Sequence, residues 1–424
     1  MARAKLPAAQ TIGEKGQGMR FSAVTERLAG QGGAKWAVHF RAAEMAAEGR
    51  DVIRLTIGEP DVPAPDSLTE AATRAMRAGR TGYSDGRGEI GLRRALAERY
   101  SAARGRSFNP DQVMCFPGTQ TALYAVMCAL AEAGDEVLVG DPMYATYEGV
   151  IRATGATMVP VPLRPGRGFR MAAEDLAAKI TPRSRAILLT TPHNPTGAIL
   201  SAGDIAAIGA VARAHDLWII SDEVYEEMVF AGAHFTSPLA DPDLAERVIA
   251  VSSISKSHAA PGFRSGWCVG PEAFTEALLP LSEVMLFGNQ PFLADMTEAA
   301  IRAGSAVAPG MRARFAARAA RLADRLERAT GLRVNRPEAG MFAMIDVSAT
   351  GMSGTDYALD LLERTGVAVM PGASFGATLD GWVRVALTVP ESQFDHAIER
   401  IVAHAAPLSG QTAGAASRAG QIVS

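Results

Sequence analysis

The sequence predicts an α/β protein built from a large and a small domain, and three observations lead to this prediction. Near-continuous apolar runs alternate with helical patterns over 52–300, which is typical of a mainly parallel sheet covered by helices on both faces. The segment 301–405 begins with a long Arg- and Ala-rich helical pattern and then mixes short strands with helices, as a smaller α+β domain does. With 424 residues and a hydrophobic content of 48%, the chain has enough apolar material for both cores.

The expected elements follow in chain order. Residues 1–18 lack periodicity and predict a disordered tail, and 19–51 predict a mostly helical segment that packs on the small domain. Short apolar runs predict the strands of the large domain, at 52–57, 136–140, 156–161, 185–190, 217–222, 247–253 and 266–270. Helical patterns lie between them or open the small domain, at 67–79, 119–132, 144–154, 201–215, 290–303 and 311–329. Small polar residues predict a flexible tail at 406–424.

Composition and charge argue against several classes of protein. The formal net charge of −3 provides no basic footprint for a nucleic acid. The three cysteines, Cys115, Cys128 and Cys268, are scattered and predict neither a disulfide framework nor a metal cluster. The first residues lack the apolar core of a secretory signal, and no apolar run reaches the roughly 18 residues of a membrane span. We therefore expect a cytoplasmic protein with no metal and no nucleic-acid or membrane partner.

One glycine motif is a weak signal. GRGEIG (86–91) fits the pattern G-x-G-x-x-G, but a dinucleotide site requires a strand directly before it. Here the preceding residues, TGYSD, are turn-like. The motif therefore predicts a loop that leads into a helix rather than a nicotinamide site.

Two motifs stand at the ends of predicted strands. NPTG (194–197) follows the run RAILLT, and SDEVY (221–225) ends the run LWIISD. Each alone could be ordinary, since Asn-Pro and Gly form common turns and an Asp after a strand often caps a helix. However, the carboxyl ends of parallel strands are where α/β proteins build their sites. Asp222 and Tyr225 are expected to lie there together.

The stretch SSISKSHAAPGFRSGW (252–267) is the most informative. Lys256 follows a predicted strand in a Ser-rich loop, and Arg264 comes eight positions later. A lone lysine is usually a solvated surface residue, but this combination also suits a phosphate-bearing carbonyl cofactor. The amine can form a Schiff base while hydroxyl groups and a guanidinium hold the phosphate.

A second candidate phosphate site begins at Gly118. The sequence PGTQTALYAVMCAL (117–130) runs from a Gly-Thr-Gln turn into an apolar helix. A helix N-terminus offers free N–H groups and partial positive charge to a phosphate, although an ordinary capped helix would look the same.

Together these motifs resemble the class I/II aminotransferases, which are pyridoxal-phosphate enzymes of fold type I. The resemblance covers roughly residues 20–405 and rests on GEPD (58–61), Tyr83 with GEIGLR (88–93), the Gly118 turn, DPMYATYEG (141–149), HNPTG (193–197), SDEVY (221–225), SISK (253–256) with Arg264, and WVRVALT (382–388). Within the family it is closest to arginine–pyruvate transaminases, in GGAKWAVHFRA (32–42), DPMYATYE (141–148), PHNPTGA (192–198), HDLWIISDEVY (215–225) and SKSHA (255–259). It implies a mainly parallel, seven-stranded sheet in the large domain, a smaller α+β domain, and pyridoxal 5′-phosphate as cofactor.

The resemblance also implies a role for each matching residue around the cofactor ring. Lys256 would carry the Schiff base and then act as general acid and base. Asp222 would face the pyridine nitrogen and keep the ring protonated. Asn194 and Tyr225 would bond the phenolic oxygen, and Tyr144 would stack on the ring.

Further residues are implied at the phosphate and at the substrate. The phosphate would be held by Gly118, Thr119, Gln120, Ser253 and Arg264. Tyr83 would reach it from a neighbouring subunit, which implies a homodimer. The substrate would meet Gly58, Asn194 and Arg384, of which Gly58 would leave room beside the cofactor and Arg384 would bind the α-carboxylate through a bidentate fork.

The expected function is the transfer of an amino group from an L-amino acid to a 2-oxo acid such as pyruvate. A basic or neutral donor such as arginine is favoured, because aspartate-preferring bacterial relatives often carry Lys at the position of Gln120. An aspartate-type or broad-specificity aminotransferase and a carbon–sulfur β-lyase on the same fold remain alternatives. A transcription regulator is disfavoured, since no helix-turn-helix pattern or basic excess precedes the fold.

Overall fold

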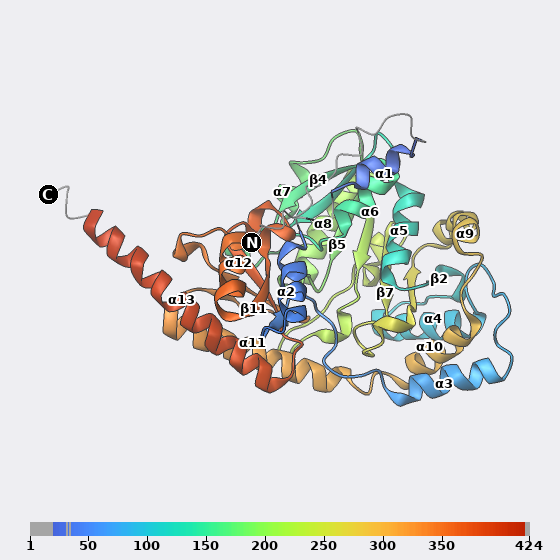
Figure 1. The fold of residues 1–424 in the computed structure, drawn as a ribbon. Coiled ribbons are helices and arrows are strands. Elements are labelled where there is room, and N and C mark those ends of the chain that lie inside the picture. The colour runs from blue at the N-terminus through green and yellow to red at the C-terminus, as the bar shows by residue number, and fades with distance from the viewer. Residues whose placement is uncertain (1–19, 31–32, 34, 420–424) are drawn as a thin grey trace.

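The computed structural model describes residues 20–419, apart from 31–32 and 34, and folds them around two sheets (Figure 1). The larger sheet has seven strands in the order β2-β8-β7-β6-β5-β3-β4. The strands are β2 (Val113–Phe116), β3 (Glu136–Asp141), β4 (Thr157–Pro162), β5 (Ser184–Thr190), β6 (Trp218–Asp222), β7 (Val248–Ser253) and β8 (Gly266–Val269). Only β8 runs antiparallel to its neighbours, which confirms the predicted, mainly parallel seven-stranded sheet.

Both faces of the larger sheet are buried, as the alternation along β5 illustrates. Ile187 and Leu189 belong to one apolar core, and Ala186 and Leu188 belong to a second core on the opposite face. The helices that contribute to the first core are α3 (Asp66–Arg77), α4 (Ile90–Arg104), α7 (Ala173–Ala177), α8 (Ala202–Ala214) and α10 (Pro291–Ala303). Those that contribute to the second are α5 (Thr119–Leu130), α6 (Tyr147–Thr154) and α9 (Glu272–Leu286). A ligand can therefore reach the large domain best at the edge where the strands end.

A smaller sheet of five strands, in the order β1-β11-β12-β10-β9, forms the second domain. Its strands are β1 (Ile53–Leu55), β9 (Val334–Asn335), β10 (Phe342–Asp346), β11 (Val367–Pro371) and β12 (Trp382–Ala386). The helices that pack with it are α11 (Ala308–Thr330), α12 (Gly354–Thr365) and α13 (Glu391–Ala419). The mixture of strands and helices agrees with the predicted α+β character.

The position of β1 corrects one prediction. The run 52–57 was expected to open the large domain, but β1 pairs in parallel with β11 of the smaller sheet. The chain therefore enters the large domain only after this strand. Strand β1 has only three residues, of which Ile53 and Leu55 are apolar and buried, and so short a pattern does not specify the partner strand.

The N-terminal segment contacts both domains. Helix α2 (Ala37–Ala47) buries Val38, Ala42 and Met45 in the apolar core of the small domain. Helix α1 (Ala23–Leu28) instead packs on α6 of the large domain, so the expectation that all of 19–51 packs on the small domain is wrong for α1. The two helices of this segment therefore pack on different domains.

The C-terminal segment differs from the expectation of a flexible tail at 406–424. Helix α13 continues to Ala419, and its end projects from the small domain in Figure 1. Residues 420–424 and the tail predicted at 1–18 lie outside the described residues.

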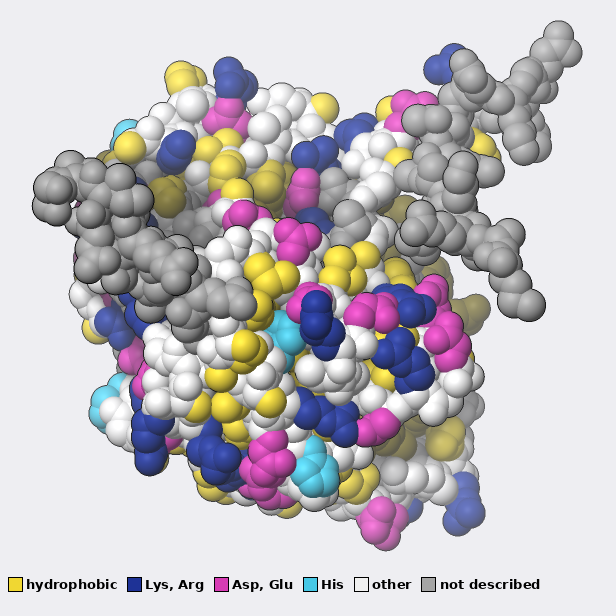
Figure 2. Space-filling model, turned by 60° about the vertical axis from the view of Figure 1, so that its left-hand side comes forward, with side chains coloured by type: hydrophobic (Ala, Val, Ile, Leu, Met, Phe, Trp, Pro, Cys, Tyr) yellow, Lys and Arg dark blue, Asp and Glu magenta, His cyan; other side chains and the backbone are white. Residues whose placement is uncertain are grey.

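Three further expectations concern loops, membranes and charge. GRGEIG forms a turn that leads into α4, as predicted. Within the described residues, no helix is long and apolar enough to cross a membrane, and no group of His, Cys, Asp and Glu could hold a metal ion. The face drawn in Figure 2 has acidic and basic side chains interspersed rather than one large patch of a single sign.

Candidate active site

A cavity of about 230 Å³ lies where the carboxyl ends of β5, β6 and β7 face the small domain. Most of the residues predicted to form the site line it, namely Gly58, Thr119, Gln120, Tyr144, Asn194, Asp222, Tyr225, Ser253, Lys256, Arg264 and Arg384. Gly118 lies beside the cavity in contact range of Arg264, whereas Tyr83 does not line it. The sheet topology thus gathers residues that are more than 300 positions apart in sequence, such as Gly58 and Arg384.

Lys256 follows β7 and projects into this cavity. Its Nζ donates a hydrogen bond of 2.9 Å to the carbonyl oxygen of Gly58. Desolvation lowers the pKa of Lys256 to about 8, although Glu59 opposes the shift. A larger fraction of the amine is therefore neutral near physiological pH than for an ordinary lysine, and the neutral amine is the nucleophile toward an aldehyde.

Asp222 ends β6 and is buried at the floor of the cavity. The hydroxyl of Tyr147 donates to Oδ2 at 2.7 Å, and the backbone N–H of Val224 donates to Oδ1 at 3.2 Å. Burial raises the pKa of Asp222 to about 6, since these hydrogen bonds only partly offset the loss of water. A buried carboxylate in this position favours a cationic N–H group opposite it, as a protonated pyridine ring offers.

The Gly118 turn and Arg264 form an anion cradle at the start of α5. Gly118 caps this helix with a φ of +86°, and a Cβ at this position would lie 2.3 Å from Nη2 of Arg264. Only glycine therefore allows the guanidinium to approach the helix N-terminus so closely. The hydroxyl oxygen of Thr119 is buried here and has no hydrogen-bond partner among the described residues.

These features fit a phosphate group. The helix N-terminus supplies N–H groups and partial positive charge, Arg264 supplies a full positive charge, and Thr119 supplies an unused donor. A buried hydroxyl without a partner costs free energy unless a ligand satisfies it. The site is therefore suited to the phosphate of pyridoxal 5′-phosphate, with Ser253 on the adjoining wall of the cavity.

Arg384, in the middle of β12, is buried and packs against two aromatic rings. The centre of its guanidinium lies 3.9 Å from the ring centroid of Phe342 and 4.3 Å from that of Phe375. Its Nη1 donates to Oδ1 of Asn194 at 2.9 Å, and its Nη2 donates to the carbonyl oxygen of Thr56 at 2.6 Å.

No acidic side chain of the described residues forms an ion pair with Arg384, and its Nε has no hydrogen-bond partner there. Burial lowers the pKa of Arg384 to about 10, so the guanidinium is still charged at neutral pH. A buried cation without a counter-charge is costly. This arrangement favours the binding of a carboxylate.

The structure gives a different reason for glycine at position 58 from the one expected. A Cβ at Gly58 would lie 2.3 Å from Cζ of Phe342, the ring that covers Arg384. Glycine is therefore needed to accommodate this ring, whereas the expectation was room for the substrate. The carbonyl oxygen of Gly58 also accepts the hydrogen bond from Lys256.

The other predicted residues occupy the walls and the rim. Tyr225 is buried and Tyr144 half-buried on the cavity wall, and burial raises the pKa of both, so their hydroxyl groups stay protonated at neutral pH. Gln120 is exposed on the rim, where its Oε1 accepts a hydrogen bond of 3.0 Å from Thr146. Tyr83 lies elsewhere: it is 89% exposed, and its ring packs 5.1 Å from that of Phe287.

Four aromatic residues that line the cavity were not predicted from the sequence as site residues, namely Trp36, Tyr147, Phe342 and Phe375. A signal existed for Tyr147, in the segment DPMYATYEG (141–149), and for Trp36, in the segment GGAKWAVHFRA (32–42), because both segments carry the family resemblance. The rings of Tyr144 and Tyr147 pack edge to face, with centroids 5.5 Å apart. Phe342 and Phe375 come from segments that carried no motif, so only the fold could bring them to the site.

The fold and the cavity define the chain as a pyridoxal-phosphate-dependent transferase of fold type I. A family model described as aminotransferase class I and II matches residues 50–401, and the chain belongs to this family. It is therefore an aminotransferase, with pyridoxal 5′-phosphate as its cofactor.

Relatives and solved structures agree with this assignment. The arginine–pyruvate transaminase of Pseudomonas aeruginosa is 42% identical over 393 residues, which covers 93% of this chain and 100% of the relative. The aspartate/prephenate aminotransferase of Thermus thermophilus is 32% identical over 86% of this chain and 94% of its own length. The solved structure of the Thermus thermophilus aspartate aminotransferase with maleate has a TM-score of 0.85 at 32% identity, covering 91% of this chain and 100% of that one.

The lowered pKa of Lys256 predicts the pH dependence of cofactor uptake. Because the neutral amine reacts, the rate at which the apoenzyme binds pyridoxal phosphate should rise with pH and level off above about pH 8. Stopped-flow absorbance between about pH 6 and pH 10 measures this rate, with Lys256→Ala as the control that should give no Schiff-base band. A rate that still rises at pH 10, as for a lysine with the ordinary pKa of 10.5, would contradict the assignment.

Proposed function

We propose that this aminotransferase transfers the amino group of a basic or neutral L-amino acid, with arginine favoured, to a 2-oxo acid such as pyruvate. One observation carries the proposal. The described residues that line the cavity include three cationic side chains, Lys256, Arg264 and Arg384, and each has a different task. Among the residues that the structure describes, no fourth cation lines the cavity to meet the side-chain carboxylate of a dicarboxylic donor.

The rim residue Gln120 supports the same conclusion. Its amide stands where a lysine would add a fourth positive charge, and it is bonded to Thr146. The 42% identical relative from Pseudomonas aeruginosa, named for arginine and pyruvate, supports this donor and acceptor. The relatives named for aspartate are 30–33% identical.

In this proposal each residue around the cofactor ring has a separate role in the reaction. When bound, pyridoxal phosphate supplies the carbonyl that takes the amino group and an electron-withdrawing ring. The amine of Lys256 holds the cofactor and then removes and returns the proton at the substrate Cα. Asp222, oriented by Tyr147, keeps a proton on the ring nitrogen. The hydroxyl of Tyr225 and the amide of Asn194 bind the phenolic oxygen, and Tyr144 stacks on the ring.

The remaining residues anchor the two ends of the complex. Gly118, Thr119, Gln120, Ser253 and Arg264 surround the phosphate. At the other end, Arg384 binds the α-carboxylate, and Asn194 holds the guanidinium in place at 2.9 Å. The rings of Phe342 and Phe375, which pack against the guanidinium, limit its freedom to reorient and so favour a bidentate fork with the carboxylate.

A homodimer is part of the proposal. Tyr83 is 89% exposed and packs against Phe287, which is 65% exposed, close to Val284, which is 88% exposed. Such an apolar group on a surface suits contact with a second copy of the chain. Tyr83 would then complete the phosphate site of the partner.

A cytoplasmic location is also proposed, and it is supported by the free thiols of Cys115, Cys128 and Cys268.

The donor specificity is tested with a panel of amino acids. With pyruvate as acceptor, kcat/KM for L-arginine should exceed that for L-aspartate by about 100-fold, because the aspartate side chain has no cation to meet it. Formation of the 2-oxo acid from the donor gives the rate, and ammonia release without an acceptor would reveal a β-lyase. Gln120→Lys should raise kcat/KM for aspartate about fivefold. A wild-type enzyme that prefers aspartate would refute the proposed donor.

The shared site is tested by mixing two inactive variants. Tyr83→Ala and Lys256→Ala subunits, reassociated in equal amounts, form some dimers in which one pocket has both intact residues. About a quarter of the wild-type activity should return, since half of the dimers are mixed and half of their pockets are complete. Size-exclusion chromatography checks the dimer itself. Mixed dimers that form but stay inactive would show that Tyr83 does not serve the partner's pocket.

A further inference from the structure

The turn that follows β6 has two chemically different sides. Asp222, Val224 and Tyr225 line the cavity, whereas the side chains of Glu223 and Glu226 reach α4 on the other side. The backbone closes this turn with a hydrogen bond of 2.9 Å from Glu226 N–H to the carbonyl oxygen of Glu223. The position of Asp222 and Tyr225 in the cavity therefore depends on what holds Glu223 and Glu226.

Arg104, the last residue of α4, holds both of these glutamates. Its Nη2 lies 3.0 Å from Oε2 of Glu223 and also bonds Oε2 of Glu226. The side chain of Glu223 has no exposed surface, and those of Arg104 and Glu226 are 8% and 9% exposed. One guanidinium thus bridges two buried carboxylates that flank the catalytic turn.

The groups around this bridge are also fixed. Oε1 of Glu223 accepts hydrogen bonds from the hydroxyls of Ser221, at 3.0 Å, and Ser237, at 2.6 Å. The guanidinium of Arg104 lies 5.2 Å from the ring centroids of both Tyr100 and Phe235. These contacts leave the guanidinium little freedom to reorient.

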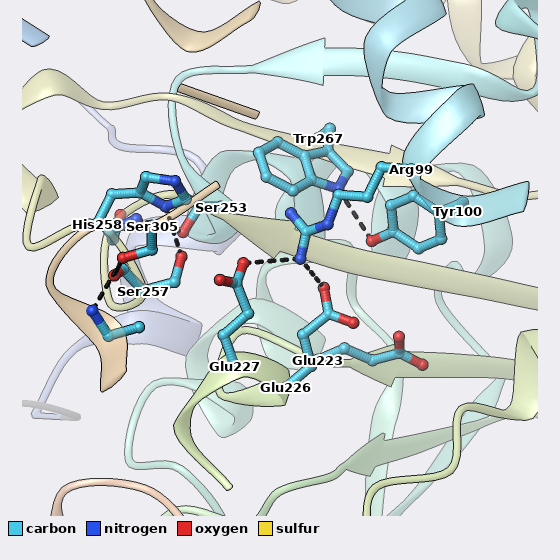
Figure 3. A network of polar contacts seen from close by, with 12 residues as sticks. Arg99, Tyr100, Glu223, Glu226, Glu227, Ser253, Ser257, His258, Trp267 and Ser305 are labelled. Atoms are coloured by element: carbon cyan, nitrogen blue, oxygen red, sulfur yellow. Dashed lines mark hydrogen bonds and ion pairs between the residues drawn. The ribbon is translucent and has the colours of Figure 1, made fainter. Parts of the chain in front are cut away.

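A second arginine extends the network along α4. Figure 3 shows Arg99 between Glu226 and Glu227, with Nη2 at 2.6 Å and 2.8 Å from their carboxylates. In the same view the indole N–H of Trp267 donates to the hydroxyl of Tyr100 at 3.0 Å. Trp267 lies on β8 opposite Ser252 of β7, the strand that leads to Lys256. Helix α4 therefore contacts the turn after β6 directly, and it contacts β8, the neighbour of β7, through Trp267.

The charges of this cluster indicate that it serves to fix the geometry of the 222–226 turn rather than to stabilise the fold. Two arginines face three glutamates, so the ionised cluster contains one excess negative charge. Burial raises the pKa of Glu223, whereas Arg99 and Arg104 lower that of Glu226 against the effect of its burial. Apolar side chains would fill such a space at a lower cost in free energy than buried ions. The Nη2 group of Arg104, in contrast, donates to both Glu223 and Glu226 and so fixes their carboxylates in one arrangement.

We propose that Arg104 is a positioning residue for the aminotransferase reaction, which fixes the 222–226 turn from behind so that Asp222 and Tyr225 face the cofactor. The inference rests on the proposed roles of Asp222 and Tyr225. Arg104 itself does not line the cavity. It acts through the two glutamates, which both bond its Nη2. A lysine side chain is one bond shorter, so its Nζ would not reach the position from which Nη2 bonds both carboxylates.

The test compares Arg104→Lys with a matched control, Arg93→Lys. Arg93 lies on the same helix and is 7% exposed, but it bonds the carbonyl oxygens of Gly88 and Pro110 rather than the turn. In the holoenzyme, Arg104→Lys should lower kcat by about 10- to 100-fold, with KM changed by less than about threefold, because the reacting groups are misplaced. The dissociation constant for pyridoxal phosphate, measured by absorbance, should rise about tenfold. Arg93→Lys should change neither quantity by more than about twofold.

Two further measurements separate positioning from stability. Amide hydrogen exchange of 221–228 in the apoenzyme should accelerate in Arg104→Lys and not in Arg93→Lys. Arg104→Met leaves Glu223 without its arginine and should lower Tm, and adding Glu223→Gln should restore Tm but not kcat. Recovery of kcat together with Tm would overturn the proposal, as would an Arg104→Lys enzyme with unchanged exchange and kcat. If Asp222→Ala retained normal turnover, the proposed role of Asp222 would fail instead.

Discussion

The active site depends on one constraint, which is the parallel direction of β5, β6 and β7. Because these strands run side by side, their carboxyl ends bring Asn194, Asp222 and Lys256 to one edge of the sheet. The small domain faces this edge and contributes Arg384 from β12. The catalytic groups are thus placed by the sheet, and the loops between them add the smaller contacts that hold the cofactor.

The site also contains two buried charged groups that, within the part of the chain that the structure describes, lack an ion-pair partner of opposite charge. Arg384 is buried without a carboxylate partner, and Asp222 is buried with hydrogen bonds but no ion pair among the described residues. Each arrangement costs free energy in the empty protein, and a bound ligand of the opposite charge recovers it. The large domain therefore provides a place for a protonated ring, and the small domain provides a place for a carboxylate. On the other side of the 222–226 turn, in contrast, the buried Arg104 of α4 forms ion pairs with Glu223 and Glu226.

Much of the fold and the chemistry could be predicted because both have local signals. Apolar runs identified six strands of the large sheet, and Lys256 with Arg264, NPTG and SDEVY identified its site. Non-local pairing had no such signal: β1 is too short to specify its sheet, and β2 was overlooked. Phe342 and Phe375 meet Arg384 only in the folded chain, and the ion pairs of Arg104 link residues 119 and 122 positions apart.

The most direct test of the central claim, that Lys256 holds the cofactor, is chemical trapping. Borohydride reduction of the holoenzyme turns the link between amine and cofactor into a stable secondary amine. Digestion and mass spectrometry should then find the added mass on the peptide that contains Lys256. The label on Lys35, Lys179 or any other amine, or no label on a protein that binds the cofactor, would contradict the assignment.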